Sequence, residues 1–74
     1  MERLNLRQLE IFSAVVDAGS FTAAAEKLYL AQSTVSDNVR ALEELLHLKL
    51  FHRESKRRLT LTLEGKRVYR YAPV

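Results

Sequence analysis

The chain has 74 residues, a formal net charge of +3 and no cysteine. This composition suits one small domain and excludes a disulfide framework or a thiolate metal site. No apolar run approaches the roughly 18 residues of a membrane span, and the first ten residues lack the apolar core of a signal peptide. We therefore expect a cytoplasmic protein with no membrane partner.

The charge is distributed unevenly along the chain. Residues 1–48 hold four basic and seven acidic residues, whereas residues 49–74 hold eight basic and two acidic residues. A basic C-terminal third predicts a polyanionic partner, although a basic surface kept for solubility would give the same pattern.

The first predicted helix covers residues 6–18. Its apolar stripe has helical spacing and consists of Leu6, Leu9, Phe12 and Val16, widened by Ile11 and Val15. Asn5 is placed to cap this helix, with Gln8 as its partner in a capping box. Gly19 can end it in the left-handed conformation.

A second, shorter helix is predicted over residues 21–28, with Ser20 as its cap. Its apolar face consists of Phe21, Ala24, Ala25 and Leu28. Because only a short connection follows, the second helix must cross the third at a steep angle, as in a helix-turn-helix. The glycine that is usual in such a turn is absent, so this prediction depends on spacing and periodicity.

The third predicted helix runs from about 32 to 46. It has one apolar stripe, formed by Val35, Val39, Leu42 and Leu46, and an outer face that starts with small polar side chains and continues with the solvent-facing charges Glu43 and Glu44. Small polar groups and free N–H groups at a helix start allow close approach to a phosphate or to the DNA major groove. A solvated, serine-rich helix face is the alternative.

A period-two pattern replaces the helical one at Leu48–Arg53 and again at Leu59–Thr62. In the second segment the leucines should point inward and the threonines outward. The basic turn between them makes a hairpin whose adjacent cations would gain most from nearby phosphates. A solvated loop is the alternative. A last helix should begin at Thr62 or Leu63 and carry an apolar side, which we expect a partner chain to cover rather than the first helix of this domain.

Several segments, in this order, resemble the N-terminal DNA-binding domain of LysR-type bacterial transcriptional regulators. They are Leu6-Arg7-Gln8-Leu9 with Phe12, Gly19 to Leu28, Gln32-Ser33 with Val35-Ser36, Ala41-Leu42-Glu43-Glu44, Leu50-Phe51 with Arg53, and Leu61-Thr62 with Gly65. The resemblance implies a mainly α fold, a winged helix-turn-helix with three helices, a two-stranded β wing and the start of a linker helix. Residues 1–62 would form the DNA-binding domain and residues 63–74 the start of the linker, or dimerisation, helix.

The resemblance also implies a function. It is sequence-specific binding of double-stranded DNA, with helix 32–46 in the major groove and wing residues 53–58 on the phosphate backbone. The partners would be DNA, a second copy of the chain in a homodimer, a tetramer in the full-length protein, and RNA polymerase as a further candidate. No cofactor is expected in this domain, because the small-molecule inducer would bind an effector domain that we expect this chain to lack.

The residues carried over by position form three groups. The base-reading candidates are Gln32, Ser33, Thr34, Ser36 and Asp37. The phosphate-binding candidates are Ser20, Thr22, Arg40, Arg53, Lys56, Arg57 and Arg58. The dimer-contact candidates are Val68, Tyr71 and Ala72.

The sequence departs from the family pattern at four positions. Ala31 replaces a frequent capping Ser, Ser33 a frequent Pro, Asp37 a frequent Arg, and His47 the usual Gly. The acidic Asp37 cannot bind guanine O6 and N7 but could accept a hydrogen bond from cytosine N4, at the cost of repulsion from phosphates.

Other function classes find less support. The only histidines, His47 and His52, have no nearby cluster of metal ligands, and the serines have no obvious base, so we expect neither a metal site nor catalysis. A protein-binding winged helix would often lack the basic wing. An RNA-binding domain would need an aromatic stacking platform, which is missing here.

Overall fold

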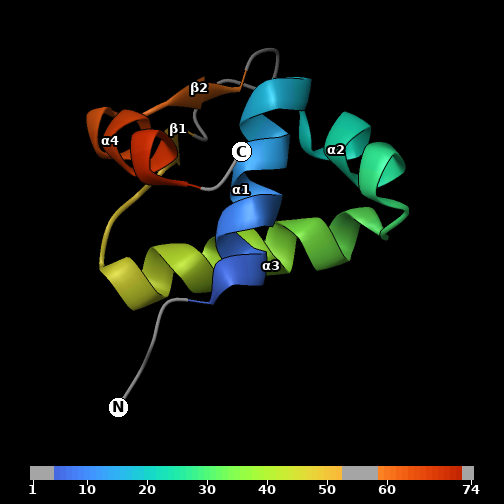
Figure 1. The fold of residues 1–74 in the computed structure, drawn as a ribbon, viewed down its shortest axis with the longest axis horizontal. Coiled ribbons are helices and arrows are strands. Elements are labelled where there is room, and N and C mark those ends of the chain that lie inside the picture. The colour runs from blue at the N-terminus through green and yellow to red at the C-terminus, as the bar shows by residue number, and fades with distance from the viewer. Residues whose placement is uncertain (1–4, 53–58, 73–74) are drawn as a thin grey trace.

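The structure, a computed structural model, describes residues 5–52 and 59–72. In these ranges the order of elements is α1 (Leu6–Ala18), α2 (Phe21–Leu28), α3 (Gln32–Leu46), β1 (Phe51–His52), β2 (Thr60–Leu61) and α4 (Leu63–Tyr71). Helix α3 crosses α1, α2 meets the N-terminal end of α3, and α4 lies beside the hairpin (Figure 1). The predicted ranges of the first three helices are confirmed, whereas each strand is shorter than the alternating pattern predicted.

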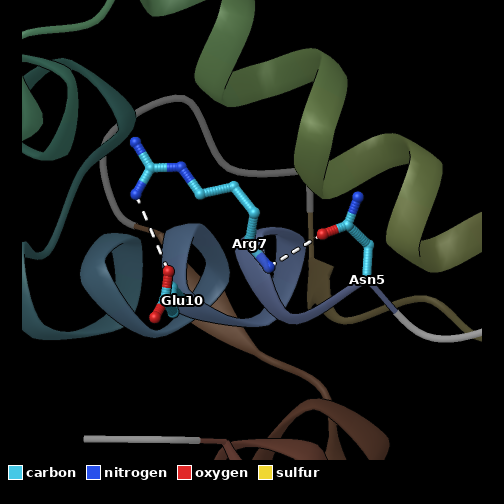
Figure 2. Close-up of polar contacts among 3 residues, drawn as sticks. All are labelled: Asn5, Arg7 and Glu10. Carbon is cyan, nitrogen blue, oxygen red and sulfur yellow. Dashed lines mark hydrogen bonds and ion pairs between the residues drawn. The ribbon is translucent and has the colours of Figure 1, made fainter.

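The cap of α1 forms differently from the prediction. The Asn5 side chain accepts a hydrogen bond from the Arg7 backbone N–H at 2.8 Å, and the Arg7 guanidinium lies 3.7 Å from the Glu10 carboxylate (Figure 2). The predicted capping box is wrong, because Gln8 Oε1 is buried without a hydrogen-bond partner. A single side-chain cap therefore begins this helix, and Gly19 ends it at a φ of 84°.

Helices α2 and α3 both end on a residue that is not glycine. Tyr29 and His47 take left-handed conformations with φ of 59° and 57°. In each case the next residue completes the turn, since Leu30 N–H donates to Ala25 O at 2.9 Å and Leu48 N–H donates to Glu43 O at 3.1 Å. Left-handed backbone costs a non-glycine residue about 1–2 kcal/mol, so these two turns are made against local preference.

The core lies where α1, α2 and α3 meet the hairpin. Val35, Val39 and Leu42 are fully buried, as the stripe of α3 predicted. Phe51 joins the hairpin to the helices, because its ring centroid lies 5.4 Å from that of Phe12 and 5.7 Å from that of Phe21. The stripe predicted for α1 is wrong at one end, where Leu6 is 60% exposed.

The segment between α3 and β1 is held from two sides. The Glu43 carboxylate accepts a hydrogen bond from the Leu50 backbone N–H at 2.8 Å. From the other side, the Thr62 hydroxyl donates to Lys49 O, and the Thr62 N–H donates to Leu50 O at 3.0 Å. The predictions that Glu43 and Thr62 face solvent are wrong: both are buried, at 3% and 8% exposure, because each side chain pairs a backbone group of this segment. Thr60 is exposed, as predicted.

Helix α4 packs against α1 and β2 of its own domain. Thr62 caps it by accepting a hydrogen bond from Gly65 N–H at 2.9 Å. The Tyr69 hydroxyl donates to the Asp17 carboxylate of α1. This hydrogen bond, with desolvation and the Asp17 charge acting in the same direction, raises the pKa of Tyr69 above its ordinary value.

Gly65 allows α4 to approach the hairpin closely. A Cβ atom at this position would lie 2.2 Å from Leu50 O and 2.9 Å from a side-chain carbon of Leu61. No real Cβ sits so near a backbone oxygen, so a larger residue would force α4 away from β1.

Replacement of Glu43 by Ala should lower the free energy of unfolding by about 1–3 kcal/mol, because it leaves the Leu50 N–H buried without its acceptor. Glu43→Gln keeps an amide oxygen and should recover most of the loss. Urea unfolding of both variants measures this. Glu44→Ala, at the exposed neighbouring position, is the control and should change stability by less than about 0.5 kcal/mol. Equal stability of Glu43→Ala and the parent chain would show that the hydrogen bond from Leu50 N–H to this carboxylate does not stabilise the fold.

Gly65→Ala should destabilise the fold by about 1–3 kcal/mol, although alanine favours a helix interior by about 1 kcal/mol over glycine. The overlap of the alanine Cβ with Leu50 O outweighs the gain in helix propensity, so the net change in stability should be a loss. Thermal unfolding followed by circular dichroism measures the effect, with Lys66→Ala at an exposed position of the same helix as control. A higher melting temperature for Gly65→Ala would contradict the close approach.

Candidate nucleic-acid interface

The N-terminal end of α3 is exposed on the side opposite the core. Gln32, Ser33, Thr34 and Asp37 are exposed and Ser36 is half-buried. Along the helix, the residues that lie opposite the buried stripe form what we call the outer ridge: Ser33, Asp37, Arg40 and Glu44, all exposed. Four of the five base-reading candidates are therefore exposed and Ser36 is partly covered; their role in reading bases stays a prediction.

The first turn of α3 lacks a side-chain cap. Ala31 occupies the cap position in an extended conformation and makes no side-chain hydrogen bond. The first N–H groups of the helix therefore have no partner from the cap residue. This confirms the weaker cap that the sequence predicted at this position.

A hydrogen bond joins the start of α2 to the start of α3. The Thr22 hydroxyl donates to Gln32 Oε1 at 3.1 Å, between residues ten apart in the sequence. A phosphate-binding candidate and a base-reading candidate thus meet on one surface. Because the Gln32 oxygen is engaged, its amide group is the part left to donate to a ligand.

Two further polar side chains near this surface are used within the fold. Ser20 accepts a hydrogen bond from Ala23 N–H at 3.0 Å and so caps α2. Asn38 turns back along α3 and donates to Thr34 O at 2.8 Å. The Ser20 oxygen is therefore used as an acceptor within α2, and the Asn38 amide is used within α3.

The structure locates only part of the predicted phosphate-binding set. Ser20, Thr22 and Arg40 lie in the described ranges, and Thr22 and Arg40 are exposed. Arg53, Lys56, Arg57 and Arg58 lie outside the described residues. Their position relative to the tip of α3 stays a prediction.

One exposed aromatic side chain was missed by the sequence analysis. Tyr29 is 94% exposed, in the connection between α2 and α3. It occupies the C-cap position of α2, three residues before Gln32, the first residue of α3. The sequence did carry a signal for this exposure: Tyr29 stands in a very short connection, where few neighbouring side chains can cover an aromatic ring.

The three dimer-contact candidates do not form one uncovered stripe. Tyr71 is 87% exposed, Val68 packs partly against the core of this domain, and Ala72 is 6% exposed. Of the two alternatives for this side, a partner chain or the first helix of this domain, the structure favours the second at Val68 and Ala72, because α4 packs against α1 and β2 of its own domain. A contact through Tyr71 stays a prediction.

The described residues hold no group of three His, Cys, Asp or Glu side chains that could bind a metal ion. His47 and His52 are exposed. No helix within 5–52 or 59–72 has the length and apolarity to cross a bilayer.

Three packed helices, the second and third joined by residues 29–31, followed by a two-stranded antiparallel hairpin, define a winged helix-turn-helix domain. Residues 6–66 match the family "Bacterial regulatory helix-turn-helix protein, lysR family". The chain belongs to this family.

The chain is similar to curated regulators over most of its own length. It is 45% identical over 69 residues to the RuBisCO operon transcriptional regulator of Allochromatium vinosum, and equally to the transcriptional activator protein LysR of Escherichia coli K12. Each alignment covers 93% of this chain and 22% of the relative. The chain thus spans about a fifth of the length of these relatives.

Two solved structures show the same fold. A crystal structure of the BenM_DBD/catB site 1 DNA complex superposes with a TM-score of 0.88 at 45% identity, covering 93% of this chain and 76% of that one. The oxidised form of Corynebacterium glutamicum OxyR gives a TM-score of 0.89 at 32% identity, covering 96% and 23%.

Substitutions at Ser20 should separate capping from ligand binding. Ser20→Ala removes the cap of α2 and should cost about 0.5–2 kcal/mol of stability. Ser20→Asp keeps a good cap but adds a negative charge, so it should retain stability and weaken binding of duplex DNA. Urea unfolding and a fluorescence-anisotropy titration with duplex DNA measure the two effects. Undiminished binding by Ser20→Asp would place Ser20 away from the phosphates.

Proposed function

We propose that this domain binds double-stranded DNA in a sequence-specific way, with α3 in the major groove. The observation that carries the proposal is the exposed, small and polar N-terminal end of α3, opposite a fully buried stripe. Its short side chains and uncapped N–H groups allow the close approach that a groove needs. The likeness to a BenM domain solved with catB site 1 DNA supports the same reading.

The residues divide into two roles under this proposal. Gln32, Ser33, Thr34, Ser36 and Asp37 face the base edges and choose the sequence. Backbone contacts fix the register without choosing the sequence; they come from Ser20, Thr22, Arg40 and the cations of the wing. The Thr22–Gln32 hydrogen bond supports this division, because it fixes one residue of each role relative to the other.

The wider context follows from the relatives. We propose that the domain works in the cytoplasm as part of a homodimer on a roughly two-fold symmetric site, with residues 63–74 at the start of the linker helix. The full regulator would be a tetramer whose separate effector domain binds a small-molecule inducer, and RNA polymerase would be a further partner. The proposed function includes no catalytic activity.

Selection of bound sequences from a random duplex DNA pool tests the proposal, followed by a salt titration on the winning duplex. We expect one enriched motif with two related halves, and a logarithm of the binding constant that falls linearly with the logarithm of the salt concentration. A duplex RNA of the same sequence should compete poorly, because the deep, narrow major groove of A-form RNA excludes a helix. A selection in which no sequence is enriched would contradict the proposed function.

The wing should contribute affinity without sequence preference. The double variant Arg57→Ala, Arg58→Ala should weaken binding to all duplexes alike and reduce the salt slope by roughly 2, about 0.9 for each lost phosphate contact. Lys66→Ala with Arg67→Ala removes the same charge from exposed positions of α4 and serves as control. An unchanged salt slope in the wing variant would show that Arg57 and Arg58 do not contact DNA phosphates.

A further inference from the structure

Asp37 is the acidic member of the predicted base-reading set, and it stands unpaired. It lies on the outer ridge between Ser33 and Arg40 and is exposed. The described part of the chain gives it no hydrogen bond and no ion pair, and Arg40, one turn further along the same ridge, does not pair with it. The carboxylate is therefore neither neutralised nor turned back onto the helix, and it projects where the proposed groove would lie.

An ionised carboxylate in this place accepts hydrogen bonds and cannot donate them. Near the phosphate backbone it is repelled, so its presence is unfavourable unless it meets a donor. In the major groove only two base groups donate, the N4 amino group of cytosine and the N6 amino group of adenine. Guanine and thymine present acceptors there and would repel the carboxylate further.

The neighbouring atoms separate cytosine from adenine. Beside the adenine amino group lies N7, an acceptor, which would face the second oxygen of the carboxylate. Beside the cytosine amino group lies an uncharged C5–H. A carboxylate is thus satisfied by cytosine and only half satisfied by adenine.

The other candidates on the same turn discriminate less. Hydroxyl groups such as those of Ser33 and Ser36 donate or accept according to the partner, and so tolerate several bases. The oxygen of Gln32 is engaged by Thr22. The Gln32 amide group is left to donate and suits a base acceptor, whereas Asp37 is the member of this set that requires a base donor.

We propose that Asp37 selects cytosine at one position in each half of the DNA site, by accepting a hydrogen bond from cytosine N4. The inference rests on the proposed function and adds to it the identity of a base and the residue that reads it. The same carboxylate lowers affinity for every duplex that offers no amino group at this position.

Separate duplex selections with the parent chain, Asp37→Ala and Asp37→Asn test the inference without assuming the position in advance. The parent motif should hold one cytosine that Asp37→Ala no longer selects. Asparagine pairs with adenine N6 and N7, so Asp37→Asn should turn that same position to adenine. Replacing the cytosine should weaken binding by the parent chain about tenfold, within the usual cost of one mismatched base pair.

Two controls sharpen the result. Glu44→Gln changes the charge by the same amount on the same ridge, about 10 Å further along the helix axis, and should leave the motif unchanged. N4-methylcytosine at the selected position, which removes one of the two amino hydrogens, should weaken binding by the parent chain more than by Asp37→Ala. Thermal unfolding should show that each variant is folded, since the position is exposed.

The outcomes separate the two proposals. An enriched motif whose base preferences are the same in the parent chain and Asp37→Ala would overturn the role of Asp37 and leave sequence-specific binding intact. A position that changes in Asp37→Ala but held a base other than cytosine would also overturn it. Failure of the parent chain to enrich any motif would overturn the proposed function and this inference with it.

Discussion

The fold depends on how the three residues after the turn at His47 are held. This segment, Leu48 to Leu50, has its backbone groups paired by Glu43 from α3 on one side and by Thr62 on the other. Leu50 is fully buried and Phe51 nearly so, which makes their backbone inaccessible to water. Unpaired groups there would cost more than the hydrogen bonds gain, so both polar side chains are needed for the hairpin to pack against the helices.

The same arrangement links the surface of α3 to α4. Glu43 lies about three turns from the N-terminal end of α3, and Thr62 caps α4. A short chain of hydrogen bonds thus runs from α3, through the backbone of Lys49 and Leu50, to Thr62 at the start of α4. The hairpin and α4 are oriented by the backbone of one segment rather than by apolar packing alone.

Helix positions could be predicted from the sequence because periodicity and caps act locally. The ranges of α1, α2 and α3, and the burial of Val35, Val39 and Leu42, follow from spacing. Glu43 was misplaced because periodicity assigns a charged residue at the edge of a stripe to solvent, and its partner, the Leu50 N–H, lies seven residues away in a different element. The same holds for the Tyr69–Asp17 contact, which joins residues 52 apart.

The sequence predicted more of the candidate site than of the side-chain contacts in the core. Exposure of the α3 tip follows from the stripe opposite it, whereas the Thr22–Gln32 hydrogen bond depends on the crossing of two helices that no local pattern encodes. Two local irregularities lie at the entry to α3, where Ala31 provides no side-chain cap and Tyr29 holds a left-handed conformation; the other left-handed non-glycine residue, His47, lies at the far end of the helix. Functional sites are where such departures from local preference are expected.

The bare α-carbon of Gly65 affects how α4 is joined to the rest of the domain. Since α4 rests against the carbonyl of Leu50 with no side chain between them, the direction in which α4 leaves the domain is set by two main chains. Exchanges among the apolar side chains of the core leave this backbone contact in place. The start of α4 is therefore anchored to the main chain of Leu50 and not to the shape of a core side chain.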